Sequence, residues 1–492
     1  MNADETSDRS TESGGAEILE SGRAEIPAAS RWPRGDASAS RQPITFVHVN
    51  DLHGAYTPDG EGTSPLARMR GFYLNALAEN PWTVFTNGGD DFEKGSVIEL
   101  ASEGRANVAL THAMGFDVRC VGNHDFAWSI ETLCDHVRDP RALTVLSNVV
   151  WSGEPAGAWA AVPFGVHQVG AVRVGFFGMV SNPWDERNEQ IGGSFYDELP
   201  LDAGVLARAA ALVATHRAEV DLLVMVSHLG LALDRAIAAS VDGIDVILGA
   251  HSHSVMAAEE VVDGCIIVQA GVSAAWIARL DLVFDRDTGT IADVAYVLTA
   301  NTPDTVPADP AMQAIVEATF EQYAPWAIEP VAHTRANPCQ DGTADVLGRA
   351  IAALEGVDGS LVDRDLLWTP IPRGAVTPQD LLDAWKVERQ PAGTPGYTGI
   401  YTAKITGTVA RRLTDLGPRW LWTGPTRFDD GDVLTIAVQK QAAWNPAHYL
   451  GAGVAFEEVT FVAEAWDLVT QYARRCTAAG RCLDDVAPPV TK

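Results

Sequence analysis

Basic residues are scarce in this chain. Lysine and arginine together number 35 among 492 residues, against 65 aspartates and glutamates, which gives a formal net charge of −30. A protein that binds the phosphate backbone of a nucleic acid needs a basic face, so we expect no nucleic acid polymer as a partner. A small anionic substrate is compatible with this charge where a bound cation reverses the local field.

Long apolar runs and zinc-type cysteine spacings are also missing. The sequence has no apolar run of about 18 residues, so we expect no membrane span. Its first residues carry no apolar segment behind a basic start, so we expect no secretory signal and a cytoplasmic protein. The six cysteines form no CxxC pair and are expected to be reduced and mostly buried. Only Cys476 and Cys482 are close enough in sequence for a local disulfide bond, and the sequence does not decide whether they form one.

The length of the chain predicts more than one domain, because a single hydrophobic core rarely organises so many residues. We expect a disordered acidic tail at 1–42, rich in Ser, Ala, Gly, Glu and Arg, and a larger domain at 43–300. A Pro/Asp linker and a connecting helix follow at 301–330, and a smaller α+β domain at 331–492. The sequence does not fix the oligomeric state.

Apolar runs alternate with helical patterns in the first domain. Runs at 44–50, 82–89 and 118–123 are separated by helical stretches at 64–79 and 97–114, which is typical of βαβ units. Further strands are expected at 144–150, 166–180, 221–230 and 245–253, followed by an antiparallel pair around the turn at 287–290. The sequence therefore predicts a strand-rich sheet structure with helices outside.

Polar side chains follow several of these strands at the point where each strand ends. The groups are Asn50 to His53, Gly88 to Asp91, Gly122 to Asp125, Ser227 with His228, and Gly249 to His253. In α/β sheets, ligands bind at the carboxyl ends of the strands, so the five loops are expected to converge on one site.

The chemistry of these side chains favours a pair of metal ions. Asp51 and His53 alternate along the chain, as do His251 and His253, and Asp90 offers two oxygens that can bridge two cations. The imidazoles suit borderline ions such as Mn, Fe, Zn or Co. Two ions about 3.5–4 Å apart activate a water for in-line attack on phosphorus.

The ordered series DxH, GGD, GNHD, SH and GxHxH resembles the calcineurin-like metallophosphoesterases. HVNDLHG and the later GAHSH are similar to the 5′-nucleotidase branch, the bifunctional metallophosphatase/5′-nucleotidase type. The resemblance runs from about residue 44 to 285 and, more weakly, from 342 to 460. It implies an N-terminal αββα sandwich that forms the metallophosphoesterase domain, and a smaller C-terminal α+β domain that binds substrate.

The resemblance also implies roles for individual residues. Two divalent ions, of Mn, Zn, Fe, Co or Mg, would be held by seven residues: Asp51, His53 and His253 on one ion, Asn123, His228 and His251 on the other, and Asp90 between them. Asn123 would also lie against substrate. His124 would stabilise the phosphoryl transition state or assist the leaving group. The alternative is that His124 orients the metal-binding loop and does not act on the substrate.

One departure from the family concerns the partner of His124. The family has an aspartate three residues after this histidine, and here the residue is Ala127. Asp125 is one candidate partner. Glu93 is another, with Lys94 reaching the phosphate, although a solvated lysine is the alternative for Lys94.

The second domain departs further from the family pattern. Phe456 falls near one of the two base-stacking positions, and Tyr397 or Phe428 is the candidate for the other. Arg364 and Arg373 are the candidates for phosphate contact. Ordinary packing or surface exposure is the alternative for each of these residues.

The function expected from the sequence is that of a two-metal phosphomonoesterase. The substrate would be a nucleoside 5′-monophosphate or a related small phosphorylated metabolite, with no membrane partner. The alternatives are a phosphodiesterase or pyrophosphatase acting on a cyclic nucleotide or dinucleotide, and a metal-binding sensor without catalysis.

Overall fold

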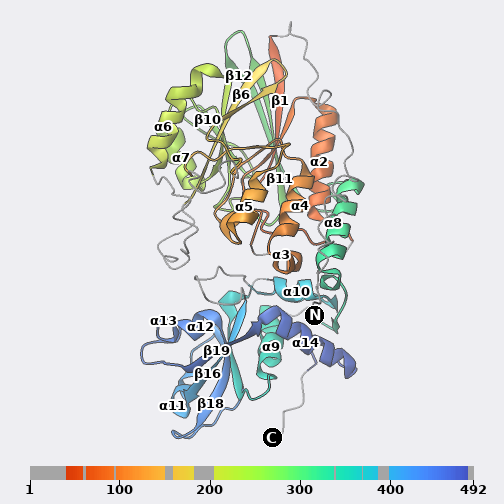
Figure 1. Ribbon diagram of the computed structural model, residues 1–492, viewed down its shortest axis with the longest axis vertical. Coiled ribbons are helices and arrows are strands. Elements are labelled where there is room, and N and C mark those ends of the chain that lie inside the picture. Colours follow the sequence, from red (N-terminus) through yellow and green to blue (C-terminus); the bar gives the residue numbers. More distant parts are fainter. Residues whose placement is uncertain are drawn as a thin grey trace, which may run out of the picture. The chain divides into compact units, whose positions relative to one another are not determined.

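The computed structural model describes residues 40–485, except 59–61, 94–95, 150–158, 182–203, 337–338, 368 and 386–397. It divides into two compact units, one comprising residues 1–93 and 98–323 and the other 94–97 and 324–492 (Figure 1). Most of the predicted tail at 1–42 lies outside the described residues, and the first strand begins at Arg41.

The first unit contains two six-stranded sheets. One sheet has the order β12-β11-β1-β2-β3-β4, made of Thr290–Ala300, Trp276–Asp285, Arg41–Val49, Thr83–Asn87, Val118–Arg119 and Leu143–Thr144. The other has the order β5-β6-β7-β8-β10-β9, made of Gly165–Val169, Val172–Val180, Leu222–His228, Val246–Gly249, Cys265–Gln269 and Glu260–Val262. In each sheet the strands that lead into the candidate site are parallel neighbours, so their carboxyl ends lie at the same edge.

The core of this unit lies between the two sheets. Apolar side chains of both sheets, such as Phe46 and Phe176, meet edge to face with their ring centroids 6.4 Å apart. Helices cover the outer faces, with α2 (Pro65–Glu79) and α4 (Arg105–Met114) on one sheet and α6 (Val205–His216) and α7 (Leu231–Ser240) on the other (Figure 1). The αββα sandwich expected from the sequence is therefore present.

Two sequence expectations are wrong in detail. The helix expected over 97–114 is broken into α3 (Val97–Ser102) and α4, because Glu103 and Gly104 adopt φ values of 52° and 82°, which lie outside the helical region. The strand expected over 144–150 is only the short β4, because Ser147 and Asn148 bond to the backbone of β6 through their side chains. Two other helices of the unit are α5 (Ile130–Val137) and α8 (Pro310–Tyr323), and α8 packs against α2 and α4.

The second unit is a smaller α+β structure. Its five-stranded sheet has the order β17-β14-β18-β16-β19, made of Trp420–Thr423, Gly359–Asp363, Val433–Gln439, Gly399–Thr406 and Glu457–Glu464, and β13 (Ala332–Thr334) pairs with β15 (Gly374–Val376). The helices are α9 (Gln340–Ala352), α10 (Pro378–Asp383), α11 (Gly407–Leu413), α12 (Lys440–Trp444), α13 (Pro446–Leu450) and α14 (Ala465–Ala478). Thr377 begins α10 with a capping box to Asp380.

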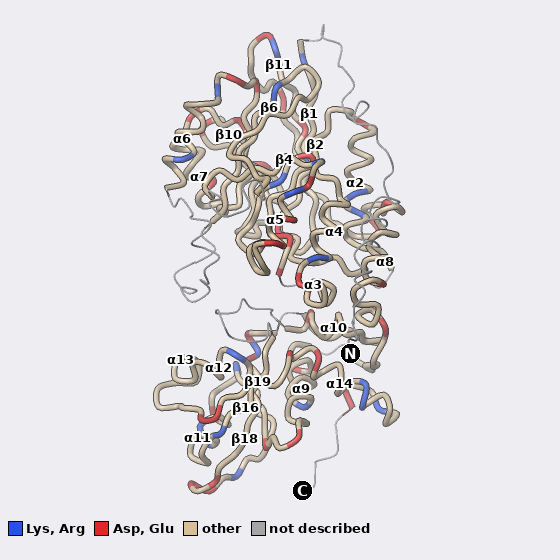
Figure 2. Tube along the Cα trace, in the orientation of Figure 1, with Lys and Arg blue, Asp and Glu red and all other residues tan. Residues whose placement is uncertain are grey.

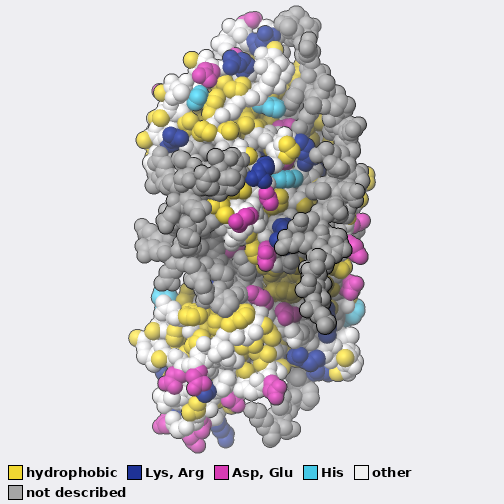
Figure 3. Space-filling view, viewed as in Figure 1, with side chains coloured by type: hydrophobic (Ala, Val, Ile, Leu, Met, Phe, Trp, Pro, Cys, Tyr) yellow, Lys and Arg dark blue, Asp and Glu magenta, His cyan; other side chains and the backbone are white. Residues whose placement is uncertain are grey.

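The surface carries both signs of charge. Lysine, arginine, aspartate and glutamate are spread along both units (Figure 2), and on the face shown in Figure 3 charged side chains are interspersed with apolar ones. Among the described residues, no helix is both long and apolar enough to span a bilayer. All six cysteines have free thiols, including Cys476 and Cys482.

Candidate metal centre

The predicted metal ligands lie together although they come from five loops and both sheets. Asp51 and His53 follow β1, Asp90 follows β2 and Asn123 follows β3 in the first sheet. From the second sheet, His228 ends β7, and the loop after β8 carries His251 and His253. The structure thus brings the seven residues into two adjoining groups.

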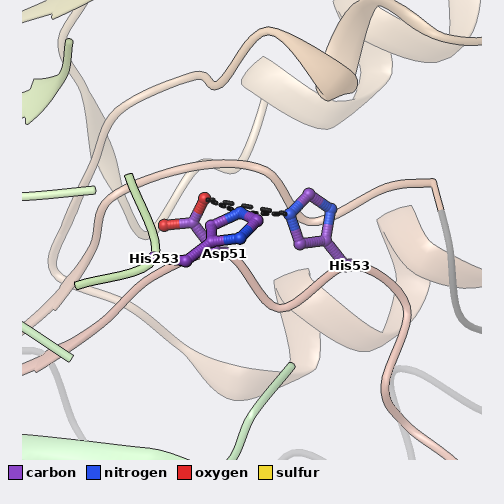
Figure 4. Close-up of side chains that lie close together, drawn as sticks. All are labelled: Asp51, His53 and His253. Atoms are coloured by element: carbon purple, nitrogen blue, oxygen red, sulfur yellow. Dashed lines mark hydrogen bonds and ion pairs between the residues drawn. The ribbon is translucent and has the colours of Figure 1, made fainter. Parts of the chain in front are cut away.

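The first group consists of Asp51, His53 and His253, whose side chains point toward one another (Figure 4). His253 Nε2 lies 3.3 Å from Asp51 Oδ1 and 3.1 Å from His53 Nε2. His53 Nε2 lies 3.8 Å from the same carboxylate oxygen. Among the described residues, none donates a well-aligned hydrogen bond to Asp51 Oδ1, although this atom is buried.

The second group consists of Asp90, His228 and His251, with the side chain of Asn123 among them. His228 Nε2 lies 3.1 Å from both Asp90 Oδ2 and Asn123 Oδ1. Asn123 Oδ1 is 2.8 Å from His251 Nδ1. Four potential ligands therefore surround one small space.

Asp90 connects the two groups through a single oxygen. Its Oδ1 accepts a hydrogen bond of 2.7 Å from the backbone N–H of His124. Its Oδ2 lies 3.1 Å from His228 Nε2 in the second group and 3.8 Å from His53 Nε2 in the first. Oδ2 is thus the atom placed to be shared between two cations.

The hydrogen bonds at the outer sides of the histidine rings decide which nitrogens face the site. His228 Nδ1 is 2.8 Å from the carbonyl oxygen of Gly88, and His53 Nδ1 is 2.9 Å from that of Glu93. A carbonyl only accepts, so each Nδ1 carries the proton and each Nε2 of a neutral ring presents a lone pair to its neighbours. Lone pairs then face carboxylate and amide oxygens, and this arrangement needs a positive charge at its centre. The donor set fits divalent metal ions.

The electrostatics of the site point the same way. Burial alone would raise the pKa of Asp90, but positive charge on His228 and His124 outweighs it and places the pKa well below its usual range. Burial opposes a charge on His228, yet the carboxylates of Asp90 and Asp51 raise its pKa to about 10. The site therefore stabilises a cation strongly, be it a proton or a metal ion.

The backbone of the ligand loops is held in an uncommon conformation. Five of the seven predicted ligands have positive φ, namely Asp51 (51°), His53 (49°), Asp90 (59°), His251 (72°) and His253 (56°). Such residues each cost about 1 kcal/mol or more and cluster at functional sites. Backbone hydrogen bonds of 2.9 Å from Asp51 to Gly89 and from His53 to Asp90 hold two of the loops together.

His124 lies at the edge of this centre, and its partner is Glu93. The Nδ1 atom of His124 is in direct contact with Glu93 Oε2, and the ring meets that of His53 edge to face at 5.0 Å. The side chain of His124 is 19% exposed, whereas that of Glu93 is 1% exposed. Lys94 lies outside the described residues.

Asp125 points away from His124 and binds backbone instead. Its two carboxylate oxygens accept hydrogen bonds from the N–H groups of Asp90 (3.0 Å), Asp91 (2.7 Å), Phe92 (3.3 Å) and Gly122 (2.7 Å). The first three belong to the loop after β2 and the last to the loop after β3. Asp125 therefore clamps two ligand loops together and does not orient the imidazole.

Sequence reasoning missed a buried ionic cluster behind this clamp. The fully buried Arg119 donates to Asp91 Oδ2 at 2.8 Å and lies 2.6 Å from His136 Nε2. Asp91 also accepts from Asn87 at 2.8 Å. The second aspartate of the GGDD sequence was the available signal, but the partners are distant in sequence and share no motif.

The candidates in the second unit are held by contacts of that unit. Arg364 forms an ion pair of 3.1 Å with Asp341 and donates to the carbonyl of Pro418, while Arg373 is exposed. Phe428 meets Trp422 edge to face at 6.0 Å, and Phe456 lies partly buried against an apolar cluster. Tyr397 lies outside the described residues. The roles of these residues in substrate binding stay predictions.

Comparison with known proteins gives a consistent picture. No model of a protein family matches the chain. An apyrase of Tabanus yao is 24% identical over 53% of this chain and 51% of the relative, and a 5′-nucleotidase of Bos taurus is 24% identical over 45% of this chain and 39% of the relative. The chain therefore spans about half or less of the length of these relatives.

A solved structure shows the same fold over nearly the whole chain. The 5′-nucleotidase precursor of Thermus thermophilus superposes with a TM-score of 0.65 and 18% identity, covering 88% of this chain and 96% of the other. That similarity includes the two-domain arrangement of a sandwich followed by a smaller domain. The relatives found by sequence are named apyrase and 5′-nucleotidase, and the matched structure has the same fold; both findings are consistent with the calcineurin-like metallophosphoesterases that the strand-end motifs resemble.

Proposed function

We propose that this chain is a two-metal phosphomonoesterase that hydrolyses a nucleoside 5′-monophosphate or a related small phosphorylated metabolite. The observation that carries the proposal is the set of acceptor atoms around His228 Nε2. Asp90 Oδ2 and Asn123 Oδ1 both lie 3.1 Å away from this atom, whose ring donates elsewhere. A matching acceptor set surrounds His53 Nε2 a short distance away.

Two divalent cations in these positions would polarise the phosphate oxygens and lower the pKa of water toward neutrality. The side chains would then fix the geometry of the reaction. Asp90 keeps one oxygen on the His124 backbone and directs the other to both groups, so the spacing of the two groups is set by one side chain.

His124 is proposed to act on the substrate directly. Its Nδ1–H donates to Glu93, so Nε2 is the ring nitrogen left for a phosphoryl oxygen or for the leaving oxygen. A protonated imidazole paired with the Glu93 carboxylate would stabilise the negative charge that develops on these oxygens. Glu93 would thus take the role that the family gives to an aspartate at the position of Ala127.

The proposal extends to the substrate, which would be a nucleotide. Relatives named 5′-nucleotidase and apyrase support a nucleotide, and the aromatic candidates Phe428 and Phe456 offer apolar faces on which a base can stack. The acidic chain makes a small anion a better substrate than a polymer.

The test is a panel of substrates with the metal-loaded protein. AMP, a sugar phosphate, ATP and bis-p-nitrophenyl phosphate are offered with Mn²⁺, to the unchanged chain and to His228→Gln. The exposed His333→Gln serves as a matched control in the second unit. We expect monoester turnover that is lost in His228→Gln and retained in His333→Gln. If only the diester or only ATP is turned over, the chain is a phosphodiesterase or a pyrophosphatase and the proposal is wrong. If the protein binds metal but turns over no ester, it is a sensor.

A further inference from the structure

Glu93 occupies a strained position at which several contacts meet. This buried glutamate has φ of +61°, which is uncommon for a residue with a side chain. Its side chain contacts His124 Nδ1, and its carbonyl oxygen accepts from His53 Nδ1 at 2.9 Å. A change in the backbone of Glu93 would therefore move the carboxylate that orients His124.

A second buried glutamate holds the backbone of Glu93. Glu99 lies in the first turn of α3 and is 2% exposed. Its Oε1 accepts from the N–H of Glu93 at 2.6 Å and from Trp128 Nε1 at 2.9 Å. Its Oε2 accepts from Asn107 Nδ2 at 2.9 Å. All three partners are donors, so the carboxylate serves as an acceptor on both oxygens.

The partners of Glu99 are themselves fixed in the fold. Asn107 lies in α4 and also donates to the carbonyl of Asp91 at 3.1 Å. The ring of Trp128 packs so closely on Gly104 that a Cβ there would lie 2.6 Å from it. Glu99 thus joins α4 and the loop after His124 to the loop after β2, which carries Asp90 and Glu93.

We propose that Glu99 is a positioning residue for His124 that acts through Glu93. By accepting the N–H of Glu93, it stabilises the left-handed backbone that aims the Glu93 carboxylate at His124 Nδ1. The hydrogen bonds of the Glu99 carboxylate go to Glu93, Trp128 and Asn107, none of which is a proposed metal ligand. The catalytic consequence rests on the proposed function, whereas the structural link between Glu99 and His124 does not.

Glu99→Gln tests the link, because the glutamine amide would set its own N–H₂ against a donor while keeping the shape of the side chain. The matched control is Glu103→Gln, the same change at a neighbouring side chain that is 72% exposed. The readout that does not depend on turnover is the histidine ¹⁵N and ¹H NMR signal of His124 Nδ1–H, assigned with a His124 variant in Zn²⁺-loaded protein. We expect this signal to shift or broaden in Glu99→Gln and to stay unchanged in Glu103→Gln.

The kinetic readout is a double-mutant cycle between positions 93 and 99. We expect Glu99→Gln to lower kcat about tenfold with KM and metal content retained. In a Glu93→Gln background the same substitution should have almost no further effect, since the route through Glu93 is already broken. An unchanged His124 signal, a fully additive cycle, or an equal loss of bound metal would each overturn the inference. A protein with no turnover on any ester would contradict the proposed function, and the NMR comparison would still decide the role of Glu99.

Discussion

The Nε2 atoms of His53 and His253 lie 3.1 Å apart, with the two rings edge to face. Because His53 Nδ1 donates to a backbone carbonyl, the lone pair of its Nε2 faces the ring of His253 and the carboxylate of Asp51. This crowding of acceptors and strained backbone is costly unless a cation binds.

Removal of metal should therefore destabilise the protein. Dialysis against a chelator should lower the thermal midpoint, and Mn²⁺ or Zn²⁺ should restore it. Metal present at about a hundred times its Kd stabilises the folded state by about 3 kcal/mol. Calorimetry with and without the chelator measures the change. An unchanged midpoint would show that the site gains no stability from a cation.

Substitution of Asp125 should remove metal and stability together. Asp125→Ala leaves four buried backbone N–H groups of two ligand loops without their acceptor. We expect a loss of about 3 kcal/mol in the free energy of unfolding, with a lowered metal affinity. Asp135→Ala, on the exposed side of α5, is the control. Retention of both metal and stability in Asp125→Ala would contradict the clamp.

Glu93→Gln should separate turnover from metal binding. The carboxylate contacts His124, whereas His53, a predicted metal ligand, is hydrogen-bonded to the backbone oxygen of Glu93. We expect kcat to fall about a hundredfold while elemental analysis finds the metal content unchanged. Activity equal to that of the unchanged chain would refute the pairing of Glu93 with His124.

The buried carboxyl of Asp234 should make stability depend on pH. Burial raises its pKa from 3.8 to about 7, although the Ser227 hydroxyl opposes the shift. The folded state therefore holds this proton more tightly than the unfolded chain, and the stabilisation from the proton is lost as the pH rises from about 4 to about 7.

Asp234→Asn removes this titration. The variant should exceed the unchanged chain in stability by roughly 2 kcal/mol at pH 8 and by little at pH 4. Urea unfolding at the two pH values measures the difference, and the same substitution at the exposed Asp242 is the control. A difference that is the same at both pH values would mean that Asp234 does not hold a proton in the folded state.

The sequence predicted most of the strands, the fold class and the residues that meet in the candidate metal centre. Alternating apolar runs located the strands, and polar motifs at their ends led to Asp51, Asp90 and His228 because parallel strands end at one edge of a sheet. The break at Glu103 was missed, because the apolar pattern of 97–114 does not encode backbone angles, although Gly104 favours the positive φ found there.

Buried residues that hold the loops of the candidate site in place were harder to predict from the sequence. Glu99 and Arg119 are charged, so their positions in the sequence look solvent-exposed, yet both are buried and bonded to groups distant in the chain. Contacts of this kind have no periodicity and no motif of their own. Only the fold brings a carboxylate of α3 next to the N–H of Glu93.

The number of metal ions bound per chain, measured by elemental analysis of active protein, tests the account most directly. The two acceptor groups predict about two ions per chain, falling to about one in His253→Ala, which removes a ligand of the first group only. The exposed His333→Ala should keep the full number. Active protein with about one ion per chain or fewer, or a metal content that His253→Ala leaves unchanged, would contradict a two-metal centre at these residues.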